Sequence, residues 1–525
     1  MPELIFEAKK GSTPVSDIER IRAAVKNIPG GKQILITKKF IDARHGKAKI
    51  VLRYELLSDS ELREHNDSII YSGLPYKDRI RSKGNDRPVV VGFGPAGIFA
   101  SLILARYGLN PIVIERGSDM ATRVKDIEEF RKGIALLKSG SNVQYGEGGA
   151  GTFSDGKLYS GISSGLKEFV SDVFIEHGAD PSILYDAHPH IGTDRLRDII
   201  VSLREEIKSL GGTVLFDTHM DGIVVKDGAV QGVEITDGSG TRIIDCDRII
   251  LAVGNSSRDT FRYLDSHGVA MEPKPFAVGV RIEHPRSAID IAQYGIDTQY
   301  TGDLSAANYK LAVDTSTGRK LYTFCMCPGG EVINASSGPQ QAVVNGMSYS
   351  KRDLCNSNSA LLVPVDRNDY GEGVLDGIRY QEELEKKAFI AGGSDGSIPV
   401  STYGMLREGK ISSSLGSITP SIRPQYKIAD LHDIFDPVIT DTITDGIAKM
   451  GRKIKGFDTP DACLSAVESR SSSPVRILRD RESRESISIR GLYPAGEGAG
   501  YAGGIMSSAI DGINCANSLA KCYIN

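Results

Sequence analysis

Two cysteines separated by a single residue are side chains whose type and spacing suggest chemistry. Cys325 and Cys327 stand in the run Cys-Met-Cys-Pro-Gly-Gly. A disulfide between such close neighbours on an extended strand requires a turn or a bulge, which the following Pro-Gly-Gly could supply. The usual redox spacing places two residues between the cysteines, so we first expect these thiols to pack beside a bound cofactor, with redox work as the alternative. Lys157 is the third candidate for a catalytic role, and no catalytic residue is assigned beyond these candidates.

Three arginines in one serine-rich segment could bind an anion. Arg470, Arg476 and Arg479 stand within residues 469–480. Their guanidinium groups suit a carboxylate or a phosphate of a substrate, because each can donate two parallel hydrogen bonds. The alternative is a loop held by ion pairs to the acids of the same stretch, Asp480 and Glu482.

A glycine-rich motif of the form G-x-G-x-x-G gives the clearest signal for ligand binding. It directly follows an apolar strand predicted over 88–91 and opens an apolar helix predicted over 98–105. Gly92 permits the tight turn, Gly94 lets the backbone approach a pyrophosphate, and Gly97 lets the helix pack against the strand. The helix N-terminus then offers free N–H groups and the positive end of the helix dipole to the phosphates.

The strand that follows this helix completes a βαβ unit and ends in an acid. Residues 111–114 are apolar, and Glu115 comes directly after them. At this place a carboxylate can accept hydrogen bonds from both hydroxyls of an adenosine ribose. The flanking strands and the acid therefore favour a dinucleotide site over an ordinary glycine-rich turn.

Two further stretches could bring main chain close to the same ligand. Residues 145–158 carry five glycines within eleven positions, which suits backbone contact with a flat ligand better than core packing. Lys157 in this stretch could place a cation beside a phosphate or a ring carbonyl. The predicted buried strand 247–253 ends in Ala252-Val253-Gly254, where the chain can pass under a bound cofactor.

The C-terminal part of the chain returns to the same arrangement. Short strands are predicted at 486–489 and 492–495, and a loop rich in glycine follows from Gly496. An apolar helix is predicted over 506–523. Its N-terminus gives a second positive helix end, which can face a second electron-rich part of one long ligand.

Two helix N-termini and one ribose-binding acid suit a two-headed dinucleotide better than NAD alone. The glycine motif with Glu115, the run DRIILAVGNSSR and the run LYPAGEGAGYAGGI resemble the three FAD-contact regions of the glutathione-reductase-type flavoprotein fold. The resemblance implies that the first loop holds the pyrophosphate and that an acid, here Glu497, lies on the ribityl–phosphate side. It also implies that the last helix points its N-terminus at the flavin O2. The usual acid is Asp, so Glu497 departs from the pattern.

Longer motifs extend the resemblance over the whole chain. QYGEGGAGTFSDGKL, FCMCPGG, NGMS, SRSSSPVRILRD and GLYPAGEGAGYAGGI together are similar to a bacterial family of uncharacterised FAD-dependent dehydrogenases. The resemblance implies FAD as the cofactor and no particular substrate. The residues that we expect to contact the cofactor are Gly92, Gly94, Pro95, Ala96, Gly97, Glu115, Arg116, Gly148, Gly149, Ala150, Gly151, Thr152, Lys157, Ala252, Gly254, Gly496, Glu497, Gly503, Gly504 and Ile505.

These elements predict an α/β protein with an α+β substrate domain. The expected architecture is a Rossmann-like FAD-binding domain of glutathione-reductase type, with an inserted substrate domain and a small N-terminal α/β domain. The charged segment Lys77–Arg87 is the predicted linker. The expected boundaries are 1–82 for the N-terminal domain, 87–259 and 485–525 for the FAD-binding domain, and 260–484 for the insert.

Further helices are predicted at 15–28, 120–139 and 193–210, and further strands at 33–40, 47–56, 213–216, 222–226, 230–235, 242–244, 276–282, 320–325 and 331–336.

The composition narrows the location and the partners. The chain has 525 residues, 25% of them charged, and a net charge of −4, which gives no general attraction to nucleic acid or to an anionic membrane. It has no signal peptide pattern and no apolar run of about 18 residues. The seven cysteines show no zinc spacing and suggest a reducing compartment. We therefore expect a cytoplasmic protein that binds a small-molecule substrate, no membrane and no metal.

The expected function is an FAD-dependent oxidoreductase that passes hydride or electrons between the flavin and a small anionic organic substrate. Because the chain shows one dinucleotide motif, NADH or NADPH would bind transiently in the active-site cleft. A flavoprotein that modifies RNA, with the N-terminal domain and the linker as its RNA handle, is the first alternative, and the net charge argues against it. A non-catalytic FAD-binding regulator is the second.

Overall fold

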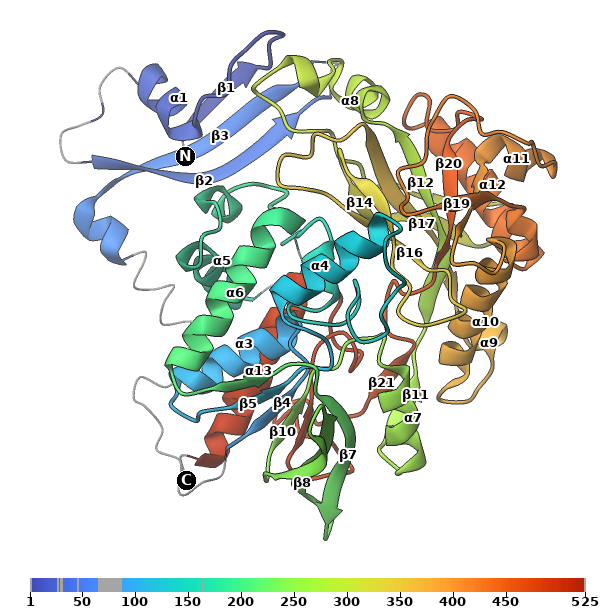
Figure 1. The fold of residues 1–525 in the computed structure, drawn as a ribbon. Coiled ribbons are helices and arrows are strands. Elements are labelled where there is room, and N and C mark those ends of the chain that lie inside the picture. The colour runs from blue at the N-terminus through green and yellow to red at the C-terminus, as the bar shows by residue number, and fades with distance from the viewer. Residues whose placement is uncertain are drawn as a thin grey trace.

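The chain folds around two large β-sheets, with a smaller sheet at the N-terminus (Figure 1). The predicted linker Lys77–Arg87 lies outside the described residues except for Arg87. The structure, a computed structural model, describes residues 2–25, 28, 32–44, 47–64, 87–159, 161–162 and 164–523.

The first large sheet is parallel and holds the glycine motif at the end of one strand. Its strand order is β22-β10-β4-β5-β6, and every neighbouring pair is parallel. The last of these strands in sequence, β22, therefore pairs with β10, far earlier in the chain. The strands are β4 (Val89–Val91), β5 (Ile112–Ile114), β6 (Thr213–Leu215), β10 (Ile249–Leu251) and β22 (Leu492–Pro494).

The two faces of this sheet are covered differently, because side chains alternate along each strand. In β4, Val90 packs in the helical layer, whereas Val89 and Val91 face the opposite layer. The central helices of the helical layer lie side by side, and a Cβ at Gly512 would come within 2.1 Å of the Ala96 carbonyl oxygen. This layer contains α3 (Pro95–Arg106), α5 (Leu166–Glu176), α6 (Thr193–Ser209) and α13 (Ile505–Ala520).

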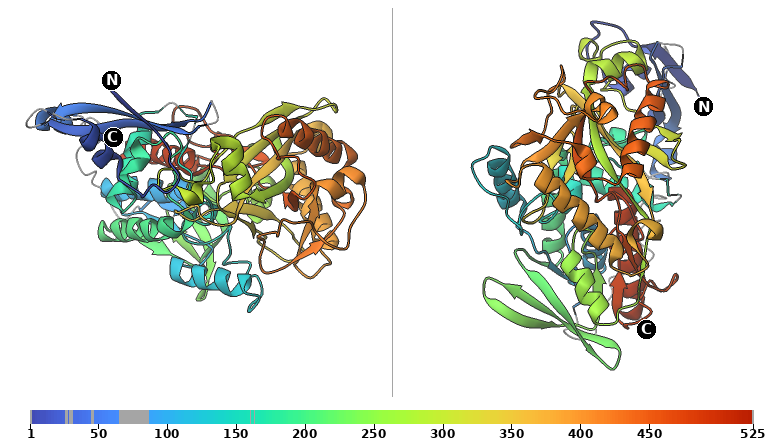
Figure 2. Two further views of the ribbon diagram at one scale, coloured as in Figure 1. Left: turned by 90° about the horizontal axis from the view of Figure 1, so that it is seen from above. Right: turned by 90° about the vertical axis from the view of Figure 1, so that its right-hand side faces the viewer.

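The opposite face carries an antiparallel three-stranded sheet that projects from one end of the molecule (Figure 2). It corresponds to the meander predicted from the short strands after residue 216. Its strands are β7 (His219–Lys226), β8 (Ala229–Asp237) and β9 (Gly240–Asp245), and α7 (Arg258–Ser266) packs beside them.

The second large sheet is mixed and has seven strands in the order β13-β14-β17-β12-β20-β18-β19. Its strands are β12 (Phe276–Pro285), β13 (Ala312–Asp314), β14 (Lys320–Cys327), β17 (Asn356–Val365), β18 (Ile398–Thr402), β19 (Tyr426–Ile428) and β20 (Cys463–Glu468). Two short pairs join it, β11 (Met271–Pro273) with β21 (Val475–Ile477) and β15 (Glu331–Asn334) with β16 (Val344–Met347). The helices of this part are α8 (Arg286–Tyr294), α9 (Arg367–Tyr370), α10 (Asp376–Ala391), α11 (Tyr403–Glu408) and α12 (Pro437–Gly451).

The N-terminal residues form an antiparallel sheet that packs on the second large sheet. The strand order is β1-β3-β2, and α1 lies against it. Ile21 and Leu52 are buried in the same hydrophobic core as Val280 of β12. The sequence predicted the helix and two of the strands but missed the first strand. The elements are β1 (Glu3–Glu7), α1 (Asp17–Ala24), β2 (Lys32–Asp42) and β3 (Lys49–Ser58).

Three sequence predictions of local structure were wrong. Residues 486–489 form no strand, since Ser486 makes only an isolated bridge to Arg479. The helix predicted over 120–139 is α4 (Met120–Arg131), and Gly133 beyond it has φ +70°, which a continuing helix does not allow. The C-terminal helix ends at Ala520 rather than at Tyr523.

Candidate functional site

A long cavity opens at the carboxyl ends of β4, β10 and β22, where an open parallel sheet usually binds its ligand. The glycine motif, both later glycine-rich loops and the end of β14 all contribute to its wall. Six predicted site residues lie outside the lining, namely Gly97, Gly148, Thr152, Cys327, Arg476 and Arg479. The predicted residues that do line it are Gly92, Gly94, Pro95, Ala96, Glu115, Arg116, Gly149, Ala150, Gly151, Lys157, Ala252, Gly254, Gly496, Glu497, Gly503, Gly504, Ile505, Cys325 and Arg470.

The three glycines of the first motif stand in different surroundings. Gly92 has φ +99°, and a Cβ there would lie 2.4 Å from the Ala252 carbonyl oxygen. A Cβ at Gly97 would lie 1.9 Å from the Gly92 carbonyl oxygen, so this glycine is needed for packing of α3 on the sheet. Gly94 differs, because its Cβ would come no closer than 3.8 Å to another residue, the Cα atom of Gly149. The backbone at Gly94 therefore faces open space at the N-terminus of α3.

Glu115 holds three backbone segments together as well as lining the cavity. Its carboxylate accepts hydrogen bonds from the N–H groups of Phe93 at 2.8 Å, Gly117 at 2.9 Å and Gly146 at 3.0 Å. A carboxylate has about four acceptor positions, so these bonds leave about one for a ligand. The expected bonds to both ribose hydroxyls would need more than that, and no sequence pattern indicated the three backbone partners.

A polar and aromatic cluster surrounds the far end of the cavity beyond Glu115. The guanidinium of Arg116 lies 4.7 Å from the centroid of the Tyr145 ring and 3.2 Å from Asp259 Oδ1. The Tyr145 hydroxyl donates to the Ser256 carbonyl oxygen at 2.5 Å. A flat, cation-bearing wall of this kind suits stacking against a base. Sequence reasoning missed Tyr145, although a tyrosine beside a glycine-rich loop was a visible signal.

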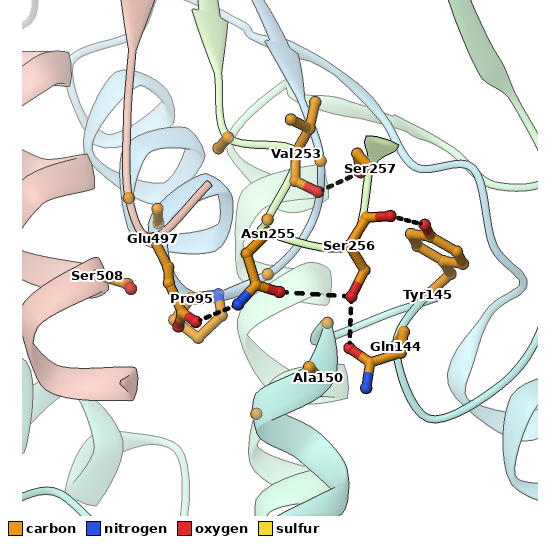
Figure 3. A pocket seen from close by; sticks show the side chains of 18 of the residues that line it. Pro95, Gln144, Tyr145, Ala150, Val253, Asn255, Ser256, Ser257, Glu497 and Ser508 are labelled. Carbon is orange, nitrogen blue, oxygen red and sulfur yellow. Dashed lines mark hydrogen bonds between the residues drawn. The ribbon is translucent and has the colours of Figure 1, made fainter. Parts of the chain in front are cut away.

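One wall of the cavity carries a continuous chain of hydrogen bonds (Figure 3). The Asn255 side-chain amide donates to Glu497 Oε1 at 2.7 Å, and the Ser256 hydroxyl donates to Gln144 Oε1 at 2.9 Å. The Ser256 hydroxyl lies 3.4 Å from Asn255 Oδ1, which joins the two halves. This chain connects the loop after β22, the loop after β10 and the second glycine-rich loop. It fixes the side chains on this wall before any ligand binds.

Glu497 is a carboxyl group held in a largely buried setting. Burial raises its pKa to about 7, against the lowering effects of the Gly504 N–H and Lys274. Beside it, a Cβ added at Gly254, Gly503 or Gly504 would meet no atom within 4 Å. The cavity is therefore bounded here by bare backbone at the N-terminus of α13, next to an acid that titrates near neutral pH.

The second glycine-rich loop meets the first glycine motif back to back. Gly149 has φ +62°, and a Cβ there would lie 2.9 Å from the Cα atom of Gly94. Gly148 and Thr152 face away from the cavity, since a Cβ at Gly148 would collide with the Thr152 hydroxyl. Gly151 lines the cavity next to Ile505, the first residue of α13. The two helix N-termini and this loop thus enclose one continuous space.

Lys157 belongs to a buried charge cluster at the other end of the cavity. Its ammonium group donates to the Met326 carbonyl oxygen and lies 3.6 Å from Asp155 Oδ2. Asp155 is fully buried and accepts two hydrogen bonds from Arg352, at 3.1 and 2.5 Å. Burial lowers the pKa of Lys157, but Asp155 and the two nearby cysteines outweigh it, so the net shift is upward. Lys157 is therefore a fixed cation in this part of the site.

The two cysteines lie on a bulge at the end of β14. Phe324 pairs with Ala360 and Cys327 pairs with Asn358, so β14 carries one extra residue against β17. Cys325 has φ +43°, a conformation that residues other than glycine rarely adopt. Cys325 lines the cavity, whereas Cys327 is fully buried behind it. The turn or bulge that the sequence analysis required for contact between these thiols is present.

The three candidate substrate arginines are each engaged by acids outside their own segment. Arg470 lines the cavity but forms two hydrogen bonds to buried Glu385, at 2.9 and 3.0 Å. The partner of Arg476 is Glu272, and Arg479 forms a two-bond pair with Asp511 at 2.6 and 3.0 Å. The predicted partners Asp480 and Glu482 were wrong. Arg476 and Arg479 do not line the cavity, so Arg470 is the one of the three that a ligand there could touch.

Among the described residues, no group of three or more His, Cys, Asp or Glu side chains could hold a metal ion. The same part of the chain contains no helix that is both long and apolar enough to cross a membrane.

Comparison with known proteins identifies the family. An uncharacterised protein of Clostridium beijerinckii is 42% identical over 496 residues, which cover 93% of this chain and 92% of that protein. The chain belongs to the family of this clostridial protein. In addition, residues 275–471 match the family model described as "FAD-dependent protein, C-terminal domain-like". The matched segment carries β14 with Cys325 and Cys327, and it ends just after Arg470.

Solved structures show only a weak likeness. A geranylgeranyl bacteriochlorophyll reductase-like protein of Thermoplasma acidophilum is 13% identical, with a TM-score of 0.38 over 83% of this chain and 78% of that one. A flavoprotein/dehydrogenase of Cytophaga hutchinsonii is 12% identical, with a TM-score of 0.36 over 84% and 78%. At such scores the likeness establishes neither a substrate nor the glutathione-reductase type of fold, which stays a prediction.

Proposed function

We propose that this protein is an oxidoreductase that binds one FAD along the cavity and uses it to oxidise or reduce a small organic molecule. The observation that carries the proposal is the shape of the wall: two helix N-termini, those of α3 and α13, open onto one space. At Gly94, Gly254, Gly503 and Gly504 an added Cβ would project into that space without meeting protein closer than 3.8 Å. Bare backbone of this kind is what a long ligand with phosphates and a flat ring requires.

The adenosine diphosphate half of the ligand would lie between α3 and Glu115. The N-terminus of α3 at Gly94 would donate N–H groups to the pyrophosphate, because the first N–H groups of a helix have no partners within it. Glu115 has about one acceptor position left for a ribose hydroxyl. Arg116 and Tyr145 form the wall against which the adenine would stack.

The flavin half would lie towards α13, with Lys157 and Cys325 at its far end. When bound, FAD supplies two-electron chemistry, and the protein supplies orientation and charge. The N-terminus of α13 at Ile505, which lines the cavity, would offer the ring a positive dipole end. Glu497, with a pKa of about 7, can hold or release a proton at its Oε2 atom near neutral pH.

The substrate would enter beside Phe324, whose side chain is 44% exposed and lines the same cavity. Lys157 brings positive charge to this end, and Arg470, beside Ser256, brings it to another part of the same wall, which supports an anionic substrate. Both are paired with acids, so the attraction they offer is moderate. NADH or NADPH would share this space in turn, since the sequence has one dinucleotide motif.

The test begins with the purified protein. Its absorbance spectrum should show a flavin, and the cofactor released by heat should be identified as FAD by chromatography. The protein should then be mixed rapidly with NADH or with NADPH under anaerobic conditions. One of the two should reduce the flavin and bleach its visible absorbance. A protein that takes up no FAD even after refolding in its presence would refute the proposal.

A further inference from the structure

The bulge at the end of β14 brings two thiols together that a regular strand would keep apart. Two residues of a regular strand are separated by about 6.7 Å along its axis. Here the Cys327 thiol turns back towards Cys325 and donates a hydrogen bond to the Cys325 carbonyl oxygen at 3.3 Å. The positive φ of Cys325 is the distortion that makes this contact possible. Strained backbone of this kind is maintained only where the surrounding structure enforces it.

The two thiols differ in their access to the cavity. Cys325 lines it, in company with Glu468 and Asn345. Cys327 lies behind, fully buried, with the Arg281 guanidinium 3.7 Å from its sulfur. This arrangement gives one cysteine that a ligand in the cavity can touch and a second cysteine directly behind it.

Charges around the pair favour a thiolate at the front position. The hydrogen bond from Cys327, followed by Lys157 and Arg281, holds the pKa of Cys325 well below its ordinary value despite burial. Burial and the neighbouring Cys325 raise the pKa of Cys327. The acids that face Cys325 are Asp155, Glu468 and Glu497, and Asp155 and Glu468 are each paired with a buried arginine.

The remaining buried thiols of the described chain behave differently. Burial raises the pKa of Cys246, Cys463 and Cys515 to about 12. These side chains are inert packing residues, as buried cysteines usually are. The setting of Cys325 is therefore a local feature of this site and not a general property of cysteines in this protein.

We propose that Cys325 and Cys327 form a redox-active dithiol that exchanges two electrons with the flavin bound in the same cavity. The inference rests on the proposed function for its electron acceptor. When the dithiol is oxidised, the Cys325 thiolate and the Cys327 thiol form one S–S bond and release two electrons and one proton, and the reverse exchange reduces the disulfide. An oxidised flavin takes up two electrons and one proton to give its anionic reduced form, so the exchange balances.

The matching substrate class is a small organic disulfide. The Cys325 thiolate would attack one sulfur of the substrate, form a mixed disulfide and release the first substrate thiol. Cys327, losing its proton, would then attack Cys325 Sγ and release the second thiol. The resulting Cys325–Cys327 disulfide would be returned to the dithiol by the reduced flavin.

Anaerobic titration with dithionite tests the couple together with the flavin. The holoprotein, first oxidised with ferricyanide and freed from it, should take up four electrons per chain, two for the flavin and two for the disulfide. Cys327→Ser should take up two. An uptake of two electrons by both proteins would overturn the dithiol. If the protein carries no flavin, the wild type should take up two electrons per chain and Cys327→Ser none. That result would refute the proposed flavin cofactor but would still support the dithiol.

Peptide mapping by mass spectrometry tests the pair without the cofactor. After treatment of flavin-free protein with glutathione disulfide, the wild type should contain an internal Cys325–Cys327 disulfide. Cys327→Ser should instead carry glutathione on Cys325. The exposed Cys355→Ser is the matched control and should leave both results unchanged, and circular dichroism should confirm that each variant is folded. Glutathione on Cys355 alone, with Cys325 unmodified in Cys327→Ser, would overturn the proposal.

Discussion

Replacing Gly94 by valine separates cofactor binding from folding, because the added side chain points into the cavity. Gly94 has φ −83° and ψ −175°, an extended conformation that any residue adopts. Its new Cβ would stay 3.8 Å from Gly149 Cα, so we expect the stability of the cofactor-free protein to change by less than about 1 kcal/mol. The valine would occupy the space through which the pyrophosphate approaches the start of α3.

The expected loss of affinity follows from the hydrogen bonds that can no longer form. Losing two charge-assisted N–H bonds to phosphate at about 1.5–3 kcal/mol each weakens binding by about 3–6 kcal/mol. This corresponds to a Kd for FAD that is roughly 10²- to 10⁴-fold higher. The assay titrates cofactor-free protein with FAD and follows the quenching of flavin fluorescence, and it measures the thermal midpoint of the same sample by circular dichroism.

Gly97→Ala is the matched control within the same motif. Its Cβ would lie 1.9 Å from the Gly92 carbonyl oxygen, so it should destabilise the cofactor-free protein by about 1–3 kcal/mol. Gly94→Val should therefore lose FAD at an unchanged thermal midpoint, whereas Gly97→Ala should lower the midpoint. The reasoning fails if Gly94→Val binds FAD within threefold of the wild type, or if its midpoint falls as far as that of Gly97→Ala.

Three further substitutions probe the acids of the structure. Because the pKa of Glu497 is raised from 4.5 to about 7 in the folded protein, the native state holds this proton more tightly than the unfolded chain does. The contribution of this group to the free energy of unfolding should be greatest at acid pH and should be lost as the pH rises through about 7. In urea unfolding of the cofactor-free protein, the fall in the free energy of unfolding between pH 5 and pH 7.5 should be smaller for Glu497→Gln than for the wild type. Glu385→Ala should cost about 3–5 kcal/mol, since it removes the nearest carboxylate from two buried guanidinium groups, those of Arg258 and Arg470. Glu382→Ala should cost under about 1 kcal/mol in the same assay, because its nearest partner is the exposed Arg262 and it lies 3.9 Å from Arg258. Glu115→Ala should lower stability by about 3 kcal/mol, because three backbone N–H groups lose their acceptor, and an unchanged denaturation midpoint would contradict this.

Much of the cofactor end of the site could be predicted from sequence, because its signals are local. The glycine motif, the strand before it and Glu115 are close in the chain, and their spacing alone indicates a βαβ unit. Even so, the sequence could not show that Glu115 ties together three backbone segments, since one of its partners, Gly146, is 31 residues away.

The reactive end depends on distortion and long-range contact, which sequence patterns do not encode. Nothing in the spacing of Cys325 and Cys327 indicates a positive φ at a residue other than glycine. Likewise, Arg479 was expected to bind a substrate or, as the alternative, to pair within its own loop, but its partner Asp511 is on a helix that is brought close by the fold of the whole domain. The N-terminal strand β1 was missed because it is short and mostly exposed, which gives it a weak hydrophobic pattern.

The strand order of the parallel sheet has a consequence for the newly made chain on the ribosome. β10 ends at Leu251, but its outer neighbour β22 begins at Leu492, about 240 residues later. At about 5–20 residues per second, the edge of β10 therefore waits roughly 10 to 50 s during synthesis. This edge is apolar and unpaired for that time, which invites pairing with other chains. Because α13 follows β22, the wall of the proposed cofactor cavity is completed only when the chain is almost fully synthesised.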